Sequence, residues 1–192
     1  MNKIYVWDLP TRLFHWGLVA LVAFQWLSGE LEDEWLEFHL LGGYAILALL
    51  AFRLIWGFIG SHYSRFSEFL RGAGPTLEYV RALRANAAPR YLGHNPLGGW
   101  MIAALLATLA LQGFTGLFAS DDVMTSGPFR YWVSDQIAEV MTELHEGSFN
   151  VLLTLAVAHV ASILAHRLFK GEDLVRPMLT GYKDSDEASK KQ

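Results

Sequence analysis

Residues 144–166 read LHEGSFNVLLTLAVAHVASILAH, and this run, almost free of charge, predicts a helix long enough to cross a bilayer. His145 and His159 lie fourteen residues apart in it. At about 100° per residue, this spacing places both imidazoles on one helix face, about 21 Å apart along the axis. Ionisable side chains inside a membrane helix are costly and usually functional. The pair therefore indicates two cofactors at two depths.

The composition excludes several classes of protein. Of the 192 residues, 53% are hydrophobic and only 18% are charged. That balance is too apolar for an ordinary soluble domain, and the helices of a soluble bundle would each show a polar face. The chain has no cysteine. Disulfides, thiolate-bound iron–sulfur clusters and c-type haem attached through Cys-x-x-Cys-His are therefore excluded.

Four apolar segments predict four membrane spans, at about residues 10–28, 37–60, 96–119 and 146–168. We predict an all-α integral membrane protein, a four-transmembrane-helix bundle that forms one domain over residues 1–182. A short helix is expected over residues 75–83, with Pro75 near its start. Residues 183–192 are predicted to be a disordered charged tail. No internal repeat is apparent.

The basic residues predict the orientation in the membrane. Fourteen of the 15 lie before span one, between spans two and three, after span four, or inside these spans near the same ends, and only Arg130 lies on the other side. The positive-inside rule then places both termini in the cytoplasm. The outer side is acidic, which would steer a basic partner such as a soluble cytochrome c. Its acidic residues are Glu30, Glu32, Asp33, Glu34, Glu37, Asp121, Asp122, Asp135, Glu139, Glu143 and Glu146.

Four histidines sort into two layers under this topology. His39 and His145 lie near the outer ends of spans two and four, whereas His15 and His159 lie nearer the cytoplasm. A bis-imidazole b haem takes one ring nitrogen from each of two facing helices. A lone intramembrane histidine is often only a packing residue, but four that pair by depth favour two haems. The expected metal ligands are therefore His15, His39, His145 and His159.

Other polar residues near the inner layer are weaker candidates. Arg53 follows His39 by fourteen residues, so it shares nearly the same face. The propionates of an inner haem would suit it or Arg12, although snorkelling to lipid phosphate explains Arg53 equally well. His62, His94 and His166 lie at the cytoplasmic boundary and are expected to be solvated rather than to bind iron.

Four motifs resemble a known family. They are residues 6–16 (VWDLPTRLFHW), 53–66 (RLIWGFIGSHYSRF), 93–100 (GHNPLGGW) and 172–181 (EDLVRPMLTG). They are similar to signatures of the bacterial cytochrome b-561 family, which includes the haem b subunits of nickel–iron hydrogenases. The resemblance covers nearly the whole chain. It implies a four-helix cytochrome with two b haems whose ligands match the four histidines named above.

The resemblance also implies a function. The expected activity is electron transfer between the quinone pool and a periplasmic partner, either a cytochrome c or a hydrogenase or dehydrogenase subunit. Quinone would react near the inner haem, where Arg12 and Asn95 are candidate contacts. The chain is thus expected to be an electron-transfer subunit, and whether it is itself a quinone or quinol oxidoreductase is left open.

Two other functions remain open at this stage. Some small members of the family oxidise superoxide and reduce quinone. The acidic outer side, with Arg130 as its one basic residue, does not favour attraction of that anion. A histidine-lined metal or proton transporter is an alternative of another class. Such transporters usually also carry carboxylates within the membrane.

Overall fold

A computed structural model describes residues 3–31, 35–120 and 126–184. The chain forms two compact units. Unit 1 comprises Met1–Leu13, Arg53–Ala104 and Val157–Gln192, and unit 2 comprises Phe14–Phe52 and Leu105–Ala156. The four long helices pass through both units, so each unit is described by itself.

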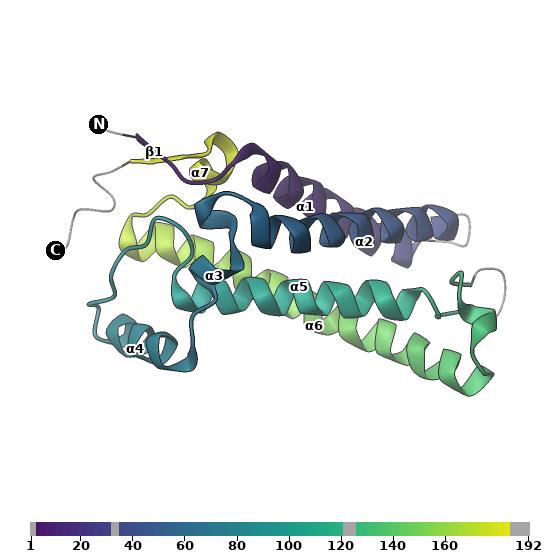
Figure 1. The fold of residues 1–192 in the computed structure, drawn as a ribbon. Helices are drawn as coiled ribbons and strands as arrows, with labels where there is room; N and C mark the ends of the chain where they lie inside the picture. The colour runs from purple at the N-terminus through teal and green to yellow at the C-terminus, as the bar shows by residue number, and fades with distance from the viewer. Residues whose placement is uncertain (1–2, 32–34, 121–125, 185–192) are drawn as a thin grey trace. The chain divides into compact units, whose positions relative to one another are not determined.

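The described chain is mostly helical, and four long helices cover the predicted spans (Figure 1). They are α1 (Leu9–Glu30), α2 (Leu36–Ile59), α5 (Pro96–Gly116) and α6 (Asp135–Lys170). Three of these, α2, α5 and α6, are long and apolar enough to cross a membrane. Helix α1 has 22 residues, but it is more polar, since it carries Arg12, His15 and Gln25.

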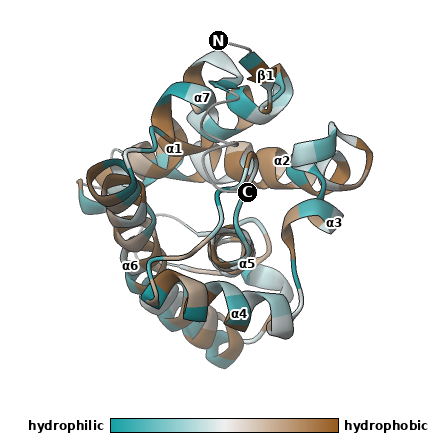
Figure 2. Ribbon diagram, turned by 90° about the vertical axis from the view of Figure 1, so that its left-hand side faces the viewer, coloured by the Kyte–Doolittle hydropathy of each residue, from teal (hydrophilic) through white to brown (hydrophobic). Residues whose placement is uncertain are grey.

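The core of unit 2 takes residues from all four long helices. Ile46 and Leu50 of α2, Leu109 of α5 and Leu152 of α6 are buried together, and Leu18, Leu21 and Val22 of α1 pack against them. Outside this core many large apolar side chains are exposed, as expected where lipid rather than water surrounds a helix. Figure 2 shows hydrophobic residues along α2 and α5.

In unit 1 the two ends of the described chain pair with each other. Strand β1 (Lys3–Tyr5) is antiparallel to β2 (Tyr182–Asp184), with Ile4 opposite Lys183. The short helix α7 (Val175–Thr180) precedes β2 and lies beside β1 in Figure 1. Lys183 and Asp184, which the sequence analysis placed in the charged tail, thus belong to β2. Lys183 is 4% exposed and forms an ion pair of 2.8 Å with Glu172, and residues 185–192 lie outside the described residues.

The motif at residues 172–181 is explained by its contacts near the paired ends of the chain. The Asp173 carboxylate accepts hydrogen bonds from the amides of Val175 and Arg176, which start α7. Gly181 ends α7 in the left-handed region with φ +91°. Its carbonyl then accepts hydrogen bonds from the amides of Val6 and Trp7. The family motif at this end of the chain thus has a structural cause.

Substitution of Gly181 by alanine is expected to destabilise unit 1 by about 1–3 kcal/mol. A Cβ atom there would lie 2.7 Å from Tyr5 Cε2 and 2.8 Å from the Trp7 carbonyl oxygen, in a backbone conformation that alanine disfavours. Gly72→Ala is the control, because nothing lies within 4 Å of a Cβ at Gly72. Thermal melting in detergent measures both variants, and equal melting temperatures would contradict the role given to Gly181.

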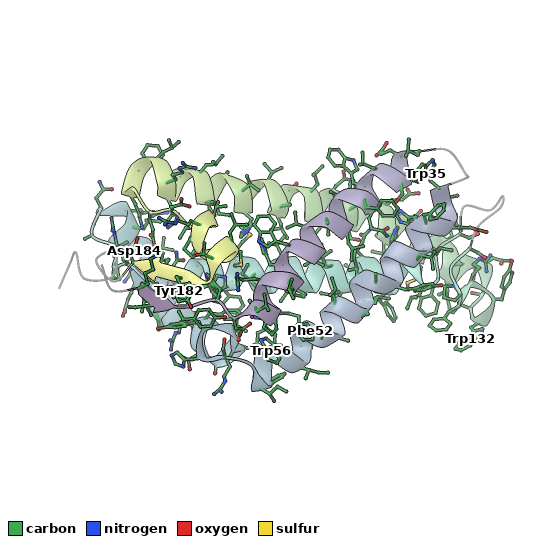
Figure 3. The ribbon with its side chains drawn as sticks, turned by 90° about the horizontal axis from the view of Figure 1, so that it is seen from above. Trp35, Phe52, Trp56, Trp132, Tyr182 and Asp184 are labelled. Carbon is green, nitrogen blue, oxygen red and sulfur yellow. The ribbon has the colours of Figure 1, made fainter. Side chains whose placement is uncertain are left out.

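The shorter elements lie mainly in unit 1. These are η2 (His62–Ser64), α3 (Phe66–Phe69) and α4 (Ala73–Arg84). The short helix predicted over residues 75–83 is confirmed as α4, with Pro75 in its first turn. In unit 2, η3 (Arg130–Trp132) precedes α6. Trp132 and Trp35 lie at the same end of unit 2, where α1 connects to α2 and α5 to α6 (Figure 3).

Candidate cofactor site

Unit 2 brings together His39 of α2 and His145 of α6, the predicted outer pair. Their ring centroids are 6.2 Å apart, and the ring planes meet at 76°. Imidazole nitrogen binds a first-row metal at about 2.0 Å, so two such bonds and two ring radii come to about 6 Å. The separation therefore fits two imidazoles that share one metal ion.

Hydrogen bonds fix the ring of His145. Its Nδ1 atom lies 2.9 Å from the main-chain carbonyl oxygen of Gln112 and 3.3 Å from Thr115 Oγ1. Because a carbonyl oxygen can only accept, Nδ1 carries the proton and Nε2 keeps its lone pair. This is the tautomer that a metal ligand needs, with the second nitrogen held by an outer partner.

His39 is held in the same way. Its Nδ1 atom lies 3.1 Å from Ser28 Oγ of α1, and the ring has a further hydrogen bond with the main chain of Gln25. The Ser28 hydroxyl donates to the Gln25 carbonyl at 3.3 Å, so its lone pairs are left to accept from Nδ1. His39 therefore also offers Nε2 as its free nitrogen.

A cavity of about 610 Å³ lies between the helices of unit 2, and both histidines line it. Its size is within the range of about 300–1,000 Å³ typical of sites for cofactors and small molecules. The lining is largely apolar, with Val22, Leu40, Leu47 and Leu109 among its members. A few polar side chains, including Gln25 and Gln112, complete it.

These residues fit a b haem by the size and the largely apolar lining of the cavity. They also fit it by the two facing imidazoles, whose separation one iron would span. No group of three or more histidine or carboxylate side chains that could hold a bare metal ion occurs in the described ranges. Two neutral imidazoles with no further ligand suit a metal already held by a macrocycle.

A metal bound at His145 Nε2 would require the side chain of Gln112 to move. The Gln112 side-chain amide lies 3.2 Å from His145 Nε2, the nitrogen that iron would use. Its Oε1 atom accepts a hydrogen bond from Ser148 Oγ. Because the amide ends a flexible side chain, it can turn away while the main-chain carbonyl of Gln112 still holds Nδ1.

The predicted inner pair belongs to two different units. His15 lies in unit 2, where its ring packs edge-on against Trp16 with centroids 4.9 Å apart. His159 lies in unit 1 on α6 and is half-buried. The pairing of these two histidines stays a prediction.

Arg53 lies inside unit 1 and is 4% exposed. One guanidinium nitrogen, Nη2, donates to the Ser64 carbonyl at 2.9 Å, and the group stacks 4.8 Å from the Phe66 ring centroid. Its Nη1 atom is buried without a hydrogen-bond partner in the described part of the chain. Snorkelling to lipid headgroups does not fit so buried a side chain, whereas an acceptor such as a propionate would satisfy Nη1.

Asp8 is a buried structural residue that the sequence analysis did not single out. It is 8% exposed, and its carboxylate accepts hydrogen bonds from the amide of Thr11, from Trp56 Nε1 and from the hydroxyls of Ser61 and Ser64. Burial alone would raise its pKa, but these hydrogen bonds, chiefly from Ser61, outweigh burial and lower the pKa. Asp8 therefore caps α1 and ties it to the end of α2.

Arg12 and Asn95, the candidate quinone contacts, both have structural partners in unit 1. Arg12 Nη1 donates to the Leu179 carbonyl at 2.6 Å, which ties α1 to α7. The Asn95 side chain accepts from the Gly98 amide at 2.7 Å and so caps α5. Asn95 also hydrogen-bonds Tyr79, whose pKa is raised by burial and by nearby Glu172 and Tyr91. Capping alone accounts for an asparagine at position 95.

The three remaining histidines have protein partners outside the outer site. His62 lies 3.3 Å from a Glu68 carboxylate oxygen. His94 packs between the rings of Trp7 and Phe69, at centroid distances of 4.8 and 5.1 Å. His166 Nδ1 donates to the Ser162 carbonyl at 2.8 Å. His94 is thus packed among aromatic rings rather than solvated as the sequence predicted.

Comparison with known proteins shows similarity along the whole chain. The model of the prokaryotic cytochrome b561 family matches residues 6–181. A probable Ni/Fe-hydrogenase B-type cytochrome subunit of Bradyrhizobium diazoefficiens is 21% identical over 93% of this chain and 85% of its own length. The corresponding subunit of Cupriavidus necator is 25% identical over 95% and 88%. Hydrogenase 1 of Escherichia coli K12 has a similar probable subunit, 20% identical over 93% and 90%.

Proposed function

The chain belongs to the prokaryotic cytochrome b561 family, and on this premise we propose that it is a di-haem membrane cytochrome. It transfers electrons between the quinone pool and a redox partner in the periplasm. The family is one of b-type cytochromes, so haem b is the cofactor. The observation that carries the proposal is the pair His39 and His145, whose protonated Nδ1 atoms are both held by protein acceptors.

The four predicted ligands divide between two haems. His39 and His145 would hold the outer haem in the cavity of unit 2, and His15 and His159 the inner one. Bound haem b supplies reversible one-electron chemistry at its iron. The protein fixes the ligand tautomers and offers Arg53 Nη1 or Arg12 to a propionate.

The proposal includes four spans with both termini in the cytoplasm of a bacterium, in its inner membrane. Helix α1 is long enough for a span despite its polar residues, since two of them, Gln25 and Ser28, face His39 rather than lipid. Fourteen of the 15 basic residues fall on the predicted cytoplasmic side, whereas His39 and His145 fall near the predicted outer ends of spans two and four. Residues 1–182 act as one haem-binding domain in this proposal.

The acidic face at the start of α6 suits a basic partner protein or a hydrogenase subunit. Asp135, Glu139, Glu143 and Glu146 are exposed and recur at helical spacing, so they share one face of α6. Glu146 also lines the haem cavity. The relatives are named as hydrogenase subunits, which favours a hydrogenase as partner, and a cytochrome c would fit the same charge. The predicted outer residues Glu32, Asp33, Glu34, Asp121 and Asp122 lie outside the described residues.

Superoxide oxidation is not favoured by this surface. Arg130, the one basic residue expected on the outer side, is already paired with Asp135 at 2.7 Å. An anion approaching the outer haem would meet Glu139, Glu143 and Glu146 without a free cation among the described residues to attract it.

Electron exchange with a basic cytochrome c is expected to slow as salt rises, because mobile ions screen the acidic face. At low salt the double variant E139Q/E143Q should exchange about tenfold more slowly than the wild type. E78Q, which removes a carboxylate from α4 instead, should not change the rate. Stopped-flow oxidation of the reduced protein measures this, and a rate independent of both salt and E139Q/E143Q would remove the steering role.

The experiment that tests the proposed function is reduction by quinol. Purified protein in lipid vesicles should show reduced b-type absorption after a quinol is added and lose it when the outer partner is added. Arg12→Ala and Asn95→Ala test the candidate quinone contacts. Protein that contains haem but does not react with quinol or quinone would contradict the proposal.

A further inference from the structure

We propose that two copies of one five-residue motif, Gln-x-x-Ser/Thr-Gly, hold the two outer haem ligands. The first copy is QWLSG at residues 25–29 of α1, and the second is QGFTG at residues 112–116 of α5. Each copy lies on the helix that precedes the helix of its histidine, α2 for His39 and α6 for His145. The inference rests on the proposed function, since it concerns ligands of a haem.

The hydroxyl residue makes equivalent contacts in both copies. Ser28 and Thr115 are each 1% exposed. Ser28 donates its proton to the Gln25 carbonyl, and Thr115 donates to the Leu111 and Gln112 carbonyls of its own helix. Each hydroxyl therefore presents only lone pairs to the Nδ1 atom of its histidine, 3.1 Å away for His39 and 3.3 Å for His145. Both contacts require the Nδ1-protonated ring.

The main chain of the glutamine supplies the second contact in both copies. Gln112 accepts Nδ1 of His145 at its carbonyl oxygen, and the main chain of Gln25 hydrogen-bonds His39. A glutamine three residues before the hydroxyl lies on the same helix face, so both groups reach one ring. His145 is held at Nδ1 by two acceptors, and His39 is held at Nδ1 by Ser28 with the Gln25 main chain as a further partner. Each ring can then leave Nε2 for iron.

The glycine lets the ring approach the helix. A Cβ at Gly29 would lie 3.4 Å from His39 Cε1, and a Cβ at Gly116 would lie 2.9 Å from His145 Cε1. The second distance is shorter than real Cβ contacts allow, so only glycine fits there. The first is at the edge of ordinary contact, which makes position 29 the more tolerant of the two.

The glutamine side chains are also placed alike. The Gln25 amide packs against Gly42, three residues after His39, so closely that a Cβ there would collide with Oε1. The Gln112 amide accepts a hydrogen bond from Ser148, three residues after His145. Both amides thus contact the next turn of the ligand helix. Four matching roles at three matching positions indicate a repeated arrangement rather than two unrelated sets of contacts.

This repeated arrangement of contacts sets the basicity of His39 and His145. Hydrogen bonds to Nδ1 make an imidazole a stronger donor to the metal, which stabilises oxidised iron and lowers the potential. Removal of either hydroxyl is therefore expected to raise the midpoint potential of one haem. Because both histidines serve the same iron, Ser28→Ala and Thr115→Val must shift the same haem and leave the other unchanged.

The test compares these variants with matched controls in purified, haem-containing protein. Thr154→Val is the control for Thr115→Val, since Thr154 lies on the face of α6 opposite to His145 and donates to Asn150. Gly147→Ala is the control for Gly116→Ala, since nothing lies within 4 Å of a Cβ there. The measurements are haem per chain, the low-spin spectrum of the oxidised iron, and the midpoint potential of each haem.

The expected result is an upward shift of one shared potential in Ser28→Ala and Thr115→Val, and a loss of about half of the haem in Gly116→Ala. Both controls should match the wild type. If the wild type holds two haems but Thr115→Val and Ser28→Ala match Thr154→Val, or shift different haems, the repeated motif has no such role. If the wild type holds no haem, the proposed function itself fails and the motif with it.

Discussion

Replacement of His145 by alanine is expected to remove about half of the bound haem, because one of the two bis-imidazole irons loses a ligand. His39→Ala should have the same effect, since the two rings lie 6.2 Å apart and are proposed to share one iron. The double variant H39A/H145A should therefore lose no more haem than either single variant. H39A/H159A, which removes one ligand from each proposed pair, should lose nearly all of it.

His166→Ala is the control for these variants. It lies on the same helix as His145 and His159, and its ring donates a hydrogen bond to the Ser162 carbonyl. Haem content per chain and the reduced-minus-oxidised spectrum measure all five variants. If H39A/H145A loses clearly more haem than either single variant, the two histidines serve different irons and the pairing is wrong.

Replacement of Asp8 by alanine is expected to give the largest loss of stability. Loss of an N-cap costs about 1 kcal/mol. Two partly buried donors, Trp56 Nε1 and the Ser61 hydroxyl, lose their acceptor at about 1–3 kcal/mol each, whereas the Ser64 hydroxyl keeps the Ser61 carbonyl. We expect a total loss of about 3–7 kcal/mol. Asp135→Ala, which breaks an exposed pair with Arg130, should cost less than about 1 kcal/mol.

Low pH should also destabilise the fold through Asp8. The pKa of Asp8 in the folded protein is lower than its ordinary value of 3.8. The ionised carboxylate therefore stabilises the fold above that value, and the contribution is lost as the pH falls through the lower folded pKa. The melting temperature of the wild type should fall more steeply below about pH 4 than that of Asp8→Asn. Parallel falls in both proteins would show that Asp8 does not carry the acid sensitivity.

The sequence alone predicted the long helices because their causes are local. Apolar runs of sufficient length, such as residues 36–59, specify a helix with little help from the rest of the chain. Histidine spacing then predicted His39 and His145 as partners, and unit 2 places their rings together. Helical periodicity and the direction of each span were enough for that step.

The contacts that hold the ligands could not be predicted in the same way. Ser28 and Thr115 are ordinary helix residues in sequence, and their roles depend on which helix lies beside them. The five-residue repeat has only three defining positions, and serine stands for threonine in one copy, so it does not stand out. Once His39 and His145 are chosen as ligands, a search for hydroxyl–glycine pairs on neighbouring helices would have found both copies.

The position of Lys183 was predicted wrongly for a related reason. Lys183 was assigned to a charged tail because its neighbours in sequence are charged. Its charge is in fact neutralised by Glu172, eleven residues earlier, and its strand is completed by residues 3–5. Long-range pairing of this kind leaves no periodic signal in either segment. Asp8 was overlooked for the same reason, since Ser61 and Ser64 come from a distant part of the chain.

The most direct test of the central claim is the amount and type of haem in the purified wild-type chain. Extraction in mild detergent, followed by a reduced-minus-oxidised visible spectrum and a haem-to-protein ratio, gives both. We predict two b-type haems per chain, each with a low-spin signal typical of two imidazole ligands. A chain that carries no haem, or only one, would contradict the assignment of His15, His39, His145 and His159 as two ligand pairs.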